Sequence, residues 1–105
     1  MTTKEFLSSL PAKVPLEAIE GVDTLFHFDI SGDGGTQATI GIKDGQVKYE
    51  DGLQGDPKCV VTASHDNLMK VLSGSLNPMM AIMTGKIKIS NTGEMMKYAK
   101  LFGLM

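Results

Sequence analysis

The sequence predicts an α+β domain with five strands and with helices gathered on one face of the sheet. Apolar and polar residues alternate along much of residues 25–63, which is the spacing of half-buried strands. From Ser64 onward the apolar spacing becomes helical, apart from a short alternating stretch at 86–89. Strands that follow one another directly, with helices grouped before and after them, favour this class over alternating parallel units.

The first 23 residues predict two short helical segments. Thr2 followed three positions later by Glu5 matches a capping box, so a helix is expected to begin there. That helix is expected to stop before Pro11, because a proline inside a helix removes a backbone hydrogen bond. Pro15 suits the first position of a second helical turn, which is expected to end at Gly21.

The middle of the chain predicts four strands. They are expected at 25–30, 38–43, 47–49 and 59–63. Asp44 and Gly45 join the second and third of these strands, and they are the residues that a type I′ hairpin turn requires. The fourth strand is apolar on both faces, which is typical of a strand in the interior of a sheet.

The last 42 residues predict three helices and a fifth strand. The helices are expected from Ser64 to Gly74, from Asn77 to Gly85 and from Thr92 towards Met105, with the strand at 86–89. Asn77 followed by Pro78 is a clear start signal, because asparagine caps a helix and proline fits its first turn.

Length and composition restrict the classes of function. The 105 residues suit one domain over the whole chain. All ten basic residues are lysine and the net charge is −2, which disfavours a nucleic-acid partner. The longest apolar run has five residues, and no apolar segment follows the N-terminus, so neither a membrane span nor a signal peptide is expected. A single cysteine, Cys59, predicts a protein of the reducing cytoplasm.

No pattern for a catalytic or metal site is complete in the sequence. Residues 29–34 match the first six positions of an EF-hand calcium loop, but Ile40 stands at position 12, where a bidentate glutamate is required. His27, His65 and Cys59 lack the spacing of metal ligands, and a cysteine in an apolar strand is usually an inert hydrophobe. We therefore expect no cofactor, no metal and no enzymatic activity.

Methionines are concentrated in the C-terminal part of the chain, where six of the eight lie between residues 69 and 96. Methionine adapts to varied apolar partners and specifies a rigid core poorly. Most of the circumference of one short helix is apolar, because it carries Met79, Met80, Ile82 and Met83. One face can pack on the sheet, so a second apolar surface must meet the side turned away from the sheet. That surface is the last helix, a lipid, a partner chain or a membrane.

Several motifs resemble the C-terminal signature of the sterol carrier protein family. They are Leu76-Asn77-Pro78 with Ala81, Gly85-Lys86-Ile87-Lys88-Ile89, and Met96-Lys97 in the final helix. The segments 43–45, 56–62 and 66–74 match the family pattern too, and the resemblance covers residues 24–103. It implies a five-stranded, mostly antiparallel sheet covered on one face by helices, with a hydrophobic tunnel between the two layers.

The resemblance also implies a non-catalytic protein that binds an elongated apolar ligand and moves it between membranes through transient contact. The ligand classes are fatty acid, acyl-CoA, phospholipid and sterol. Family positions and the apolar helical stripes together predict ten ligand-binding residues: Leu68, Leu72, Met79, Ile82, Met83, Ile87, Met95, Met96, Ala99 and Phe102. Two alternatives stay open, an interaction module that forms a homodimer through its methionine-rich surface, and an enzyme that uses the cavity for its substrate.

Charge is distributed unevenly along the chain. Residues 86–105 carry a net charge of +3, whereas residues 1–85 carry −5. The excess rests on four lysines, Lys86, Lys88, Lys97 and Lys100. They are either solvated side chains or a basic lip that contacts anionic headgroups.

Overall fold

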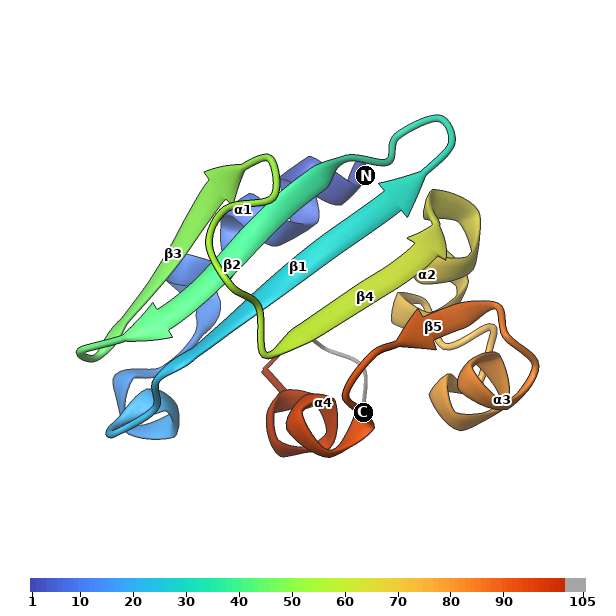
Figure 1. Cartoon of the computed structure of the whole chain (residues 1–105). Helices are drawn as coiled ribbons and strands as arrows, with labels where there is room; N and C mark the ends of the chain where they lie inside the picture. Colours follow the sequence, from blue (N-terminus) through green and yellow to red (C-terminus); the bar gives the residue numbers. More distant parts are fainter. Residues whose placement is uncertain (102–105) are drawn as a thin grey trace.

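The computed structural model describes residues 1–101, in which helices cover one face of a five-stranded sheet (Figure 1). The strands are β1 (Thr24–Ser31), β2 (Gln37–Lys43), β3 (Gln46–Asp51), β4 (Cys59–Ser64) and β5 (Ile87–Ile89). The helical segments are α1 (Thr3–Lys13), the 3-10 turn η1 (Leu16–Ile19), α2 (His65–Leu72), α3 (Pro78–Met83) and α4 (Thr92–Tyr98). The α+β class and the five strands are confirmed.

The sheet has the strand order β3-β2-β1-β4-β5. Neighbouring strands are antiparallel except for β1 and β4, which are parallel, so the mostly antiparallel sheet is confirmed. The chain passes from β3 to β4 through residues 52–58, which cross the face opposite the helices (Figure 1). Thr39 holds this crossing, since its hydroxyl donates to the Gly52 carbonyl and accepts from the Gln54 amide, each at 2.8 Å.

The hydrophobic core lies between the sheet and the helices. Phe26 and Phe28 of β1 pair with Ile40 and Ala38 of β2, and all four side chains are at most 1% exposed. Leu7 of α1 is fully buried as well. Complete burial of one large apolar side chain stabilises a fold by roughly 1.5–3 kcal/mol, so this layer orients the helices on the sheet.

Local start signals are confirmed at the residues that carry them. The Thr2 hydroxyl accepts from the Glu5 amide at 3.1 Å, and the Glu5 carboxylate accepts from the Thr2 amide at 3.0 Å, which completes the capping box. Asp44 and Gly45 both have positive φ, at 53° and 73°, as a type I′ turn demands. Asn77 caps α3.

Two helix ends differ from the expectation. α1 continues through Pro11 to Lys13, because Leu10 and the rest of its apolar side pack on the sheet and that packing outweighs the hydrogen bond that proline removes. α4 ends at Tyr98 and continues as a turn in which the Leu101 amide donates to the Tyr98 carbonyl at 2.9 Å. The expectation of a helix running towards Met105 is therefore wrong for the described residues.

Tyr49 on the edge strand β3 makes stability sensitive to alkaline pH. Partial burial, together with a 2.8 Å hydrogen bond to Asp51, raises the pKa of Tyr49 from 10.0 to about 12. The folded protein thus holds this proton more tightly than the unfolded chain, so the contribution is complete below pH 10 and is lost as pH rises towards 12. We expect Tyr49→Phe to give a shallower fall in melting temperature over this window; equal slopes in the two proteins would contradict the assignment.

Candidate functional site

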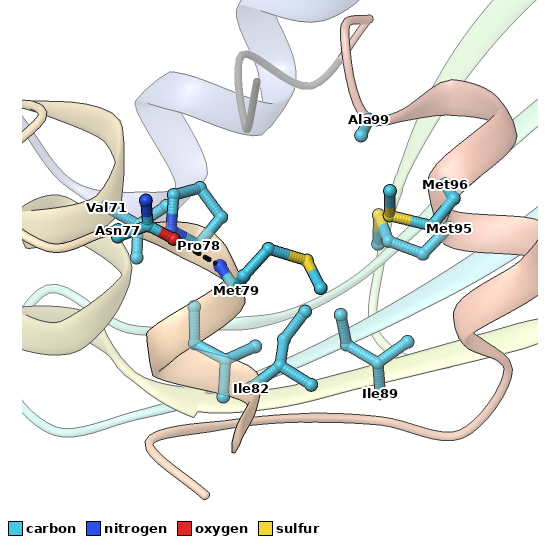
Figure 2. Close-up of a pocket in the computed structure, with 10 residues that line it drawn as sticks. Val71, Asn77, Pro78, Met79, Ile82, Ile89, Met95, Met96 and Ala99 are labelled. Atoms are coloured by element: carbon cyan, nitrogen blue, oxygen red, sulfur yellow. Dashed lines mark hydrogen bonds between the residues drawn. The ribbon is translucent and has the colours of Figure 1, made fainter. Parts of the chain in front are cut away.

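An apolar pocket of about 260 Å³ lies between β5 at the edge of the sheet and the helices α2, α3 and α4 (Figure 2). Its lining residues are Val71, Asn77, Pro78, Met79, Ile82, Ile87, Ile89, Met95, Met96 and Ala99. Nine of these ten residues are apolar, and Asn77 is the one polar residue among them. The expected apolar space between sheet and helices is present in this form.

The floor and one wall of the pocket follow from local structure. Ile87 and Ile89 alternate along β5, so both side chains lie on the helix side of the sheet. The Asn77 side-chain oxygen accepts from the amides of Met79 and Met80, at 2.9 and 3.3 Å, and thereby starts α3. The Met79 side chain then reaches across the pocket towards Met95 and Met96 (Figure 2).

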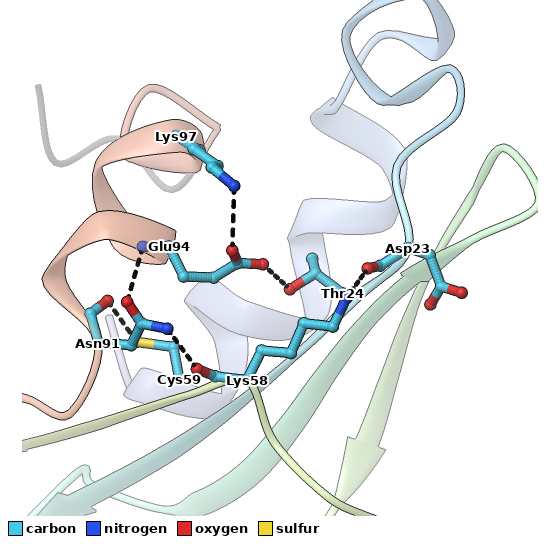
Figure 3. A network of polar contacts seen from close by, with 7 residues as sticks. All are labelled: Asp23, Thr24, Lys58, Cys59, Asn91, Glu94 and Lys97. Carbon is cyan, nitrogen blue, oxygen red and sulfur yellow. Dashed lines mark hydrogen bonds and ion pairs between the residues drawn. The ribbon is translucent and has the colours of Figure 1, made fainter.

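The opposite wall is α4, which a polar network holds at its first turn (Figure 3). The buried Thr24 hydroxyl of β1 donates to the Glu94 carboxylate at 2.5 Å. Asn91 caps the helix by accepting from the Glu94 amide at 3.1 Å, and it donates to the Lys58 carbonyl at 3.2 Å. Lys97 lies 3.6 Å from Glu94. This network fixes the amino-terminal end of α4 against the start of β1 and the residue before β4.

Methionines line both the interior of the pocket and its opening, which we call the rim. Met95 is 2% exposed and lies inside, whereas Met79 and Met96 are 53% and 46% exposed. The pocket therefore opens to solvent between α3 and α4, and its two rim side chains are unbranched and flexible. Such a rim can move to admit a longer apolar molecule.

Six of the ten predicted ligand-binding residues line this pocket: Met79, Ile82, Ile87, Met95, Met96 and Ala99. Leu68 is buried in the core, and Leu72 faces a separate groove beside Phe6 and Met69. Met83 is 77% exposed and does not line the pocket, and Phe102 lies outside the described residues. Ligand contact at each of the ten residues stays a prediction.

Four lining residues were not among the predicted ones. Ile89 carries a usable signal, because it alternates with Ile87 on the same short strand. Val71 shares a helical face with Leu68 and Leu72, and although Val71 and Leu68 both belong to the buried core, Val71 also borders the pocket and Leu68 does not. Asn77 and Pro78 have a local role as a helix start, and their sequence does not reveal that they also border a cavity.

The four predicted headgroup lysines have different surroundings. Lys97 forms an ion pair with Glu94, so part of its charge is compensated. Lys88 pairs with the exposed Thr62 across the β4–β5 ladder, so its side chain lies on the sheet face opposite the pocket. Lys86 and Lys100 are exposed. Headgroup or membrane contact by these lysines stays a prediction.

Cys59 is a buried residue of the hydrophobic core. It is fully buried, and its thiol donates to the Asn91 carbonyl at 3.5 Å. Burial raises the pKa of this thiol, which keeps it protonated at neutral pH and lowers its reactivity.

Among residues 1–101, no three or more His, Cys, Asp or Glu side chains are grouped to hold a metal ion. Within the same residues no helix has the length and apolar character needed to cross a bilayer.

A five-stranded sheet with an apolar pocket at one edge, rimmed by flexible side chains, has the geometry of a domain that binds an apolar ligand. Comparison with known proteins places it more closely: the model of the SCP-2 sterol transfer family matches residues 4–105, and the chain belongs to this family. The expected resemblance is confirmed, and membership supports lipid binding and transfer as the general function.

Individual relatives agree with this assignment. Hydroxysteroid dehydrogenase-like protein 2 of Bos taurus is 37% identical over 92 residues, which cover 85% of this chain and 21% of that protein. Sterol carrier protein 2 of Gallus gallus is 31% identical over 87 residues, which cover 79% of this chain and 16% of that protein. The solution structure of the sterol carrier protein domain 2 of Helicoverpa armigera has a TM-score of 0.73 and 27% identity, and the match covers 95% of this chain and 84% of that one. The chain thus spans about a fifth of the length of the curated relatives.

Proposed function

We propose that the pocket binds one acyl chain, from a fatty acid, an acyl-CoA or a phospholipid, and that the domain carries this lipid between membranes without chemical change. The observation that carries the proposal is the lining, in which nine of ten residues are apolar. The polar residue, Asn77, already uses its side-chain oxygen to cap α3. Among residues 1–101, this lining therefore offers no acid, base or nucleophile to a bound molecule.

The size of the pocket favours an acyl chain over a sterol. An engineered apolar cavity of about 150 Å³ accepts benzene, so on the same scale a pocket of about 260 Å³ takes roughly ten carbons. Ten carbons are a segment of a flexible acyl chain, and the two flexible rim side chains, Met79 and Met96, can make room for the remaining carbons. A rigid fused-ring nucleus cannot be divided in this way, and it requires a wider opening of α3 from α4.

Native mass spectrometry of freshly purified protein tests the proposal first, since a bound lipid adds a defined mass. After delipidation, a long-chain fatty acid at one hundred times its Kd is expected to stabilise the protein by about 2.7 kcal/mol. For a domain of this size the melting temperature then rises by roughly 10 °C. Cholesterol is the comparison ligand, with a smaller expected shift. A delipidated monomer that melts at the same temperature with and without fatty acid would refute the proposal.

A further inference from the structure

The outer side of α3 is an apolar surface that the fold leaves in water. Met79, Met80 and Met83 are 53%, 52% and 77% exposed, whereas Ala81 of the same helix is fully buried. Met96 of α4, which is 46% exposed, lies across the pocket opening from Met79. Two of the four, Met79 and Met96, line the pocket, whereas Met80 and Met83 do not.

The segment around the α3 methionines is positively charged. Residues 67–93 contain three lysines, Lys70, Lys86 and Lys88, and no acidic residue, so this stretch carries +3 in a chain of net charge −2. All three lysines are exposed. Lys70 lies on α2 and Lys86 lies between α3 and β5, and both α2 and β5 contact α3. The Lys88 side chain lies on the opposite face of the sheet. An apolar helix surface is therefore flanked by basic side chains.

We propose that α3 docks on an anionic lipid surface, with its methionines in the interfacial layer and with Lys70 and Lys86 near the headgroups. The inference rests on the proposed function in one respect, because docking at α3 sets the pocket opening between Met79 and Met96 against the bilayer from which a lipid enters. Each lysine close to such a surface strengthens binding about fivefold, and buried apolar area adds to it.

Charge complementarity selects the lipid surface over a second copy of the chain. Two copies that met through α3 would bring their lysines towards one another, and like charges at a contact oppose association. α1 is a poorer docking element, since Leu7 and Leu10 are buried against the sheet and the charged Lys4, Glu5 and Lys13 are exposed. α3 combines exposed apolar side chains with exposed lysines on or next to the elements that contact it.

A tryptophan reporter tests the contact directly, because the chain contains no tryptophan. In Met83→Trp the single indole replaces the most exposed methionine of α3 without touching the pocket lining. With vesicles of phosphatidylcholine and phosphatidylserine, its emission is expected to shift to the blue and to be quenched by brominated lipid. Leu16→Trp is the matched control, since Leu16 is 70% exposed in η1 and should stay in water.

Co-sedimentation with the same vesicles measures the contributions of charge and apolar contact. Lys70→Gln with Lys86→Gln is expected to weaken binding about 25-fold at low salt, from about fivefold for each lysine. The control pair, Lys43→Gln with Lys48→Gln on the β2–β3 hairpin, removes the same charge. If the vesicle contacts the protein at α3, this pair should change vesicle binding by no more than about twofold. Met80→Gln with Met83→Gln keeps side-chain length and is expected to weaken binding tenfold or more.

The outcomes separate this inference from the proposed function. Fatty acid should still raise the melting temperature of the Met80→Gln, Met83→Gln variant, because neither residue lines the pocket. Met83→Trp emission that is unchanged by anionic vesicles, or equal shifts at Leu16→Trp, would overturn docking through α3 while leaving the pocket in place. A blue shift that grows with protein concentration in the absence of vesicles would overturn it in favour of a second copy. If fatty acid fails to bind and the reporter still shifts, docking stands and the proposed function falls.

Discussion

Replacing Ala99 with leucine is expected to block the pocket and, at the same time, to stabilise the empty protein. Ala99 is 2% exposed and borders the cavity, so the three added carbons enter unfilled apolar space. Filling such space contributes about 1–2 kcal/mol, which raises the melting temperature of the delipidated protein by several degrees. Because the ligand loses that volume, fatty acid affinity is expected to fall at least tenfold in a displacement assay with a fluorescent acyl chain.

Ala81→Leu is the matched control for that substitution. Ala81 is fully buried in α3 and does not line the pocket, so the same added carbons meet packed atoms. Overpacking of this kind costs about 1–3 kcal/mol, and the melting temperature should fall. Opposite signs for the two variants are the expected result. A fall of similar size in both would mean that no usable space exists beside Ala99.

Replacing Thr24 with valine is expected to loosen α4 with little change elsewhere. Valine keeps the shape of threonine, but it removes the 2.5 Å hydrogen bond that Glu94 accepts, and Glu94 is largely buried. A hydrogen bond to a charged group contributes about 1.5–3 kcal/mol. Amides of α4 should therefore exchange with solvent roughly ten- to a hundredfold faster, while amides of β1 and β2 keep their rates. Fatty acid affinity should fall too, since α4 supplies Met95, Met96 and Ala99.

Thr39→Val gives the comparison on the other face of the sheet. Thr39 is 2% exposed, and its hydroxyl holds the crossing segment 52–58 rather than α4. Its loss should speed exchange in that segment and leave both α4 and ligand affinity as they are. If the two variants destabilise the protein uniformly, α4 opens only with global unfolding and the polar network has no local role at the pocket.

Features that depend on neighbours in the chain could be predicted from the sequence. The period-two spacing of Phe26 and Phe28 marks a strand, Asp44 with Gly45 marks its hairpin type, and Asn77 marks the start of α3. Each is decided within a few residues by backbone sterics or a capping hydrogen bond. The motifs of the C-terminal half were enough to predict the family, which the match over residues 4–105 confirms.

The tertiary structure decided which apolar side chains fill the core and which enclose a cavity. Leu68 and Val71 lie on one face of α2 and both belong to the buried core, yet Val71 also borders the pocket while Leu68 does not. Periodicity identifies the face that leaves water, but what stands opposite that face depends on elements distant in the chain. The same reason applies to Pro11, where packing of α1 on the sheet carried the helix past a residue that ordinarily stops one. It applies as well to α4, whose anchor joins Glu94 to Thr24 across 70 positions of sequence.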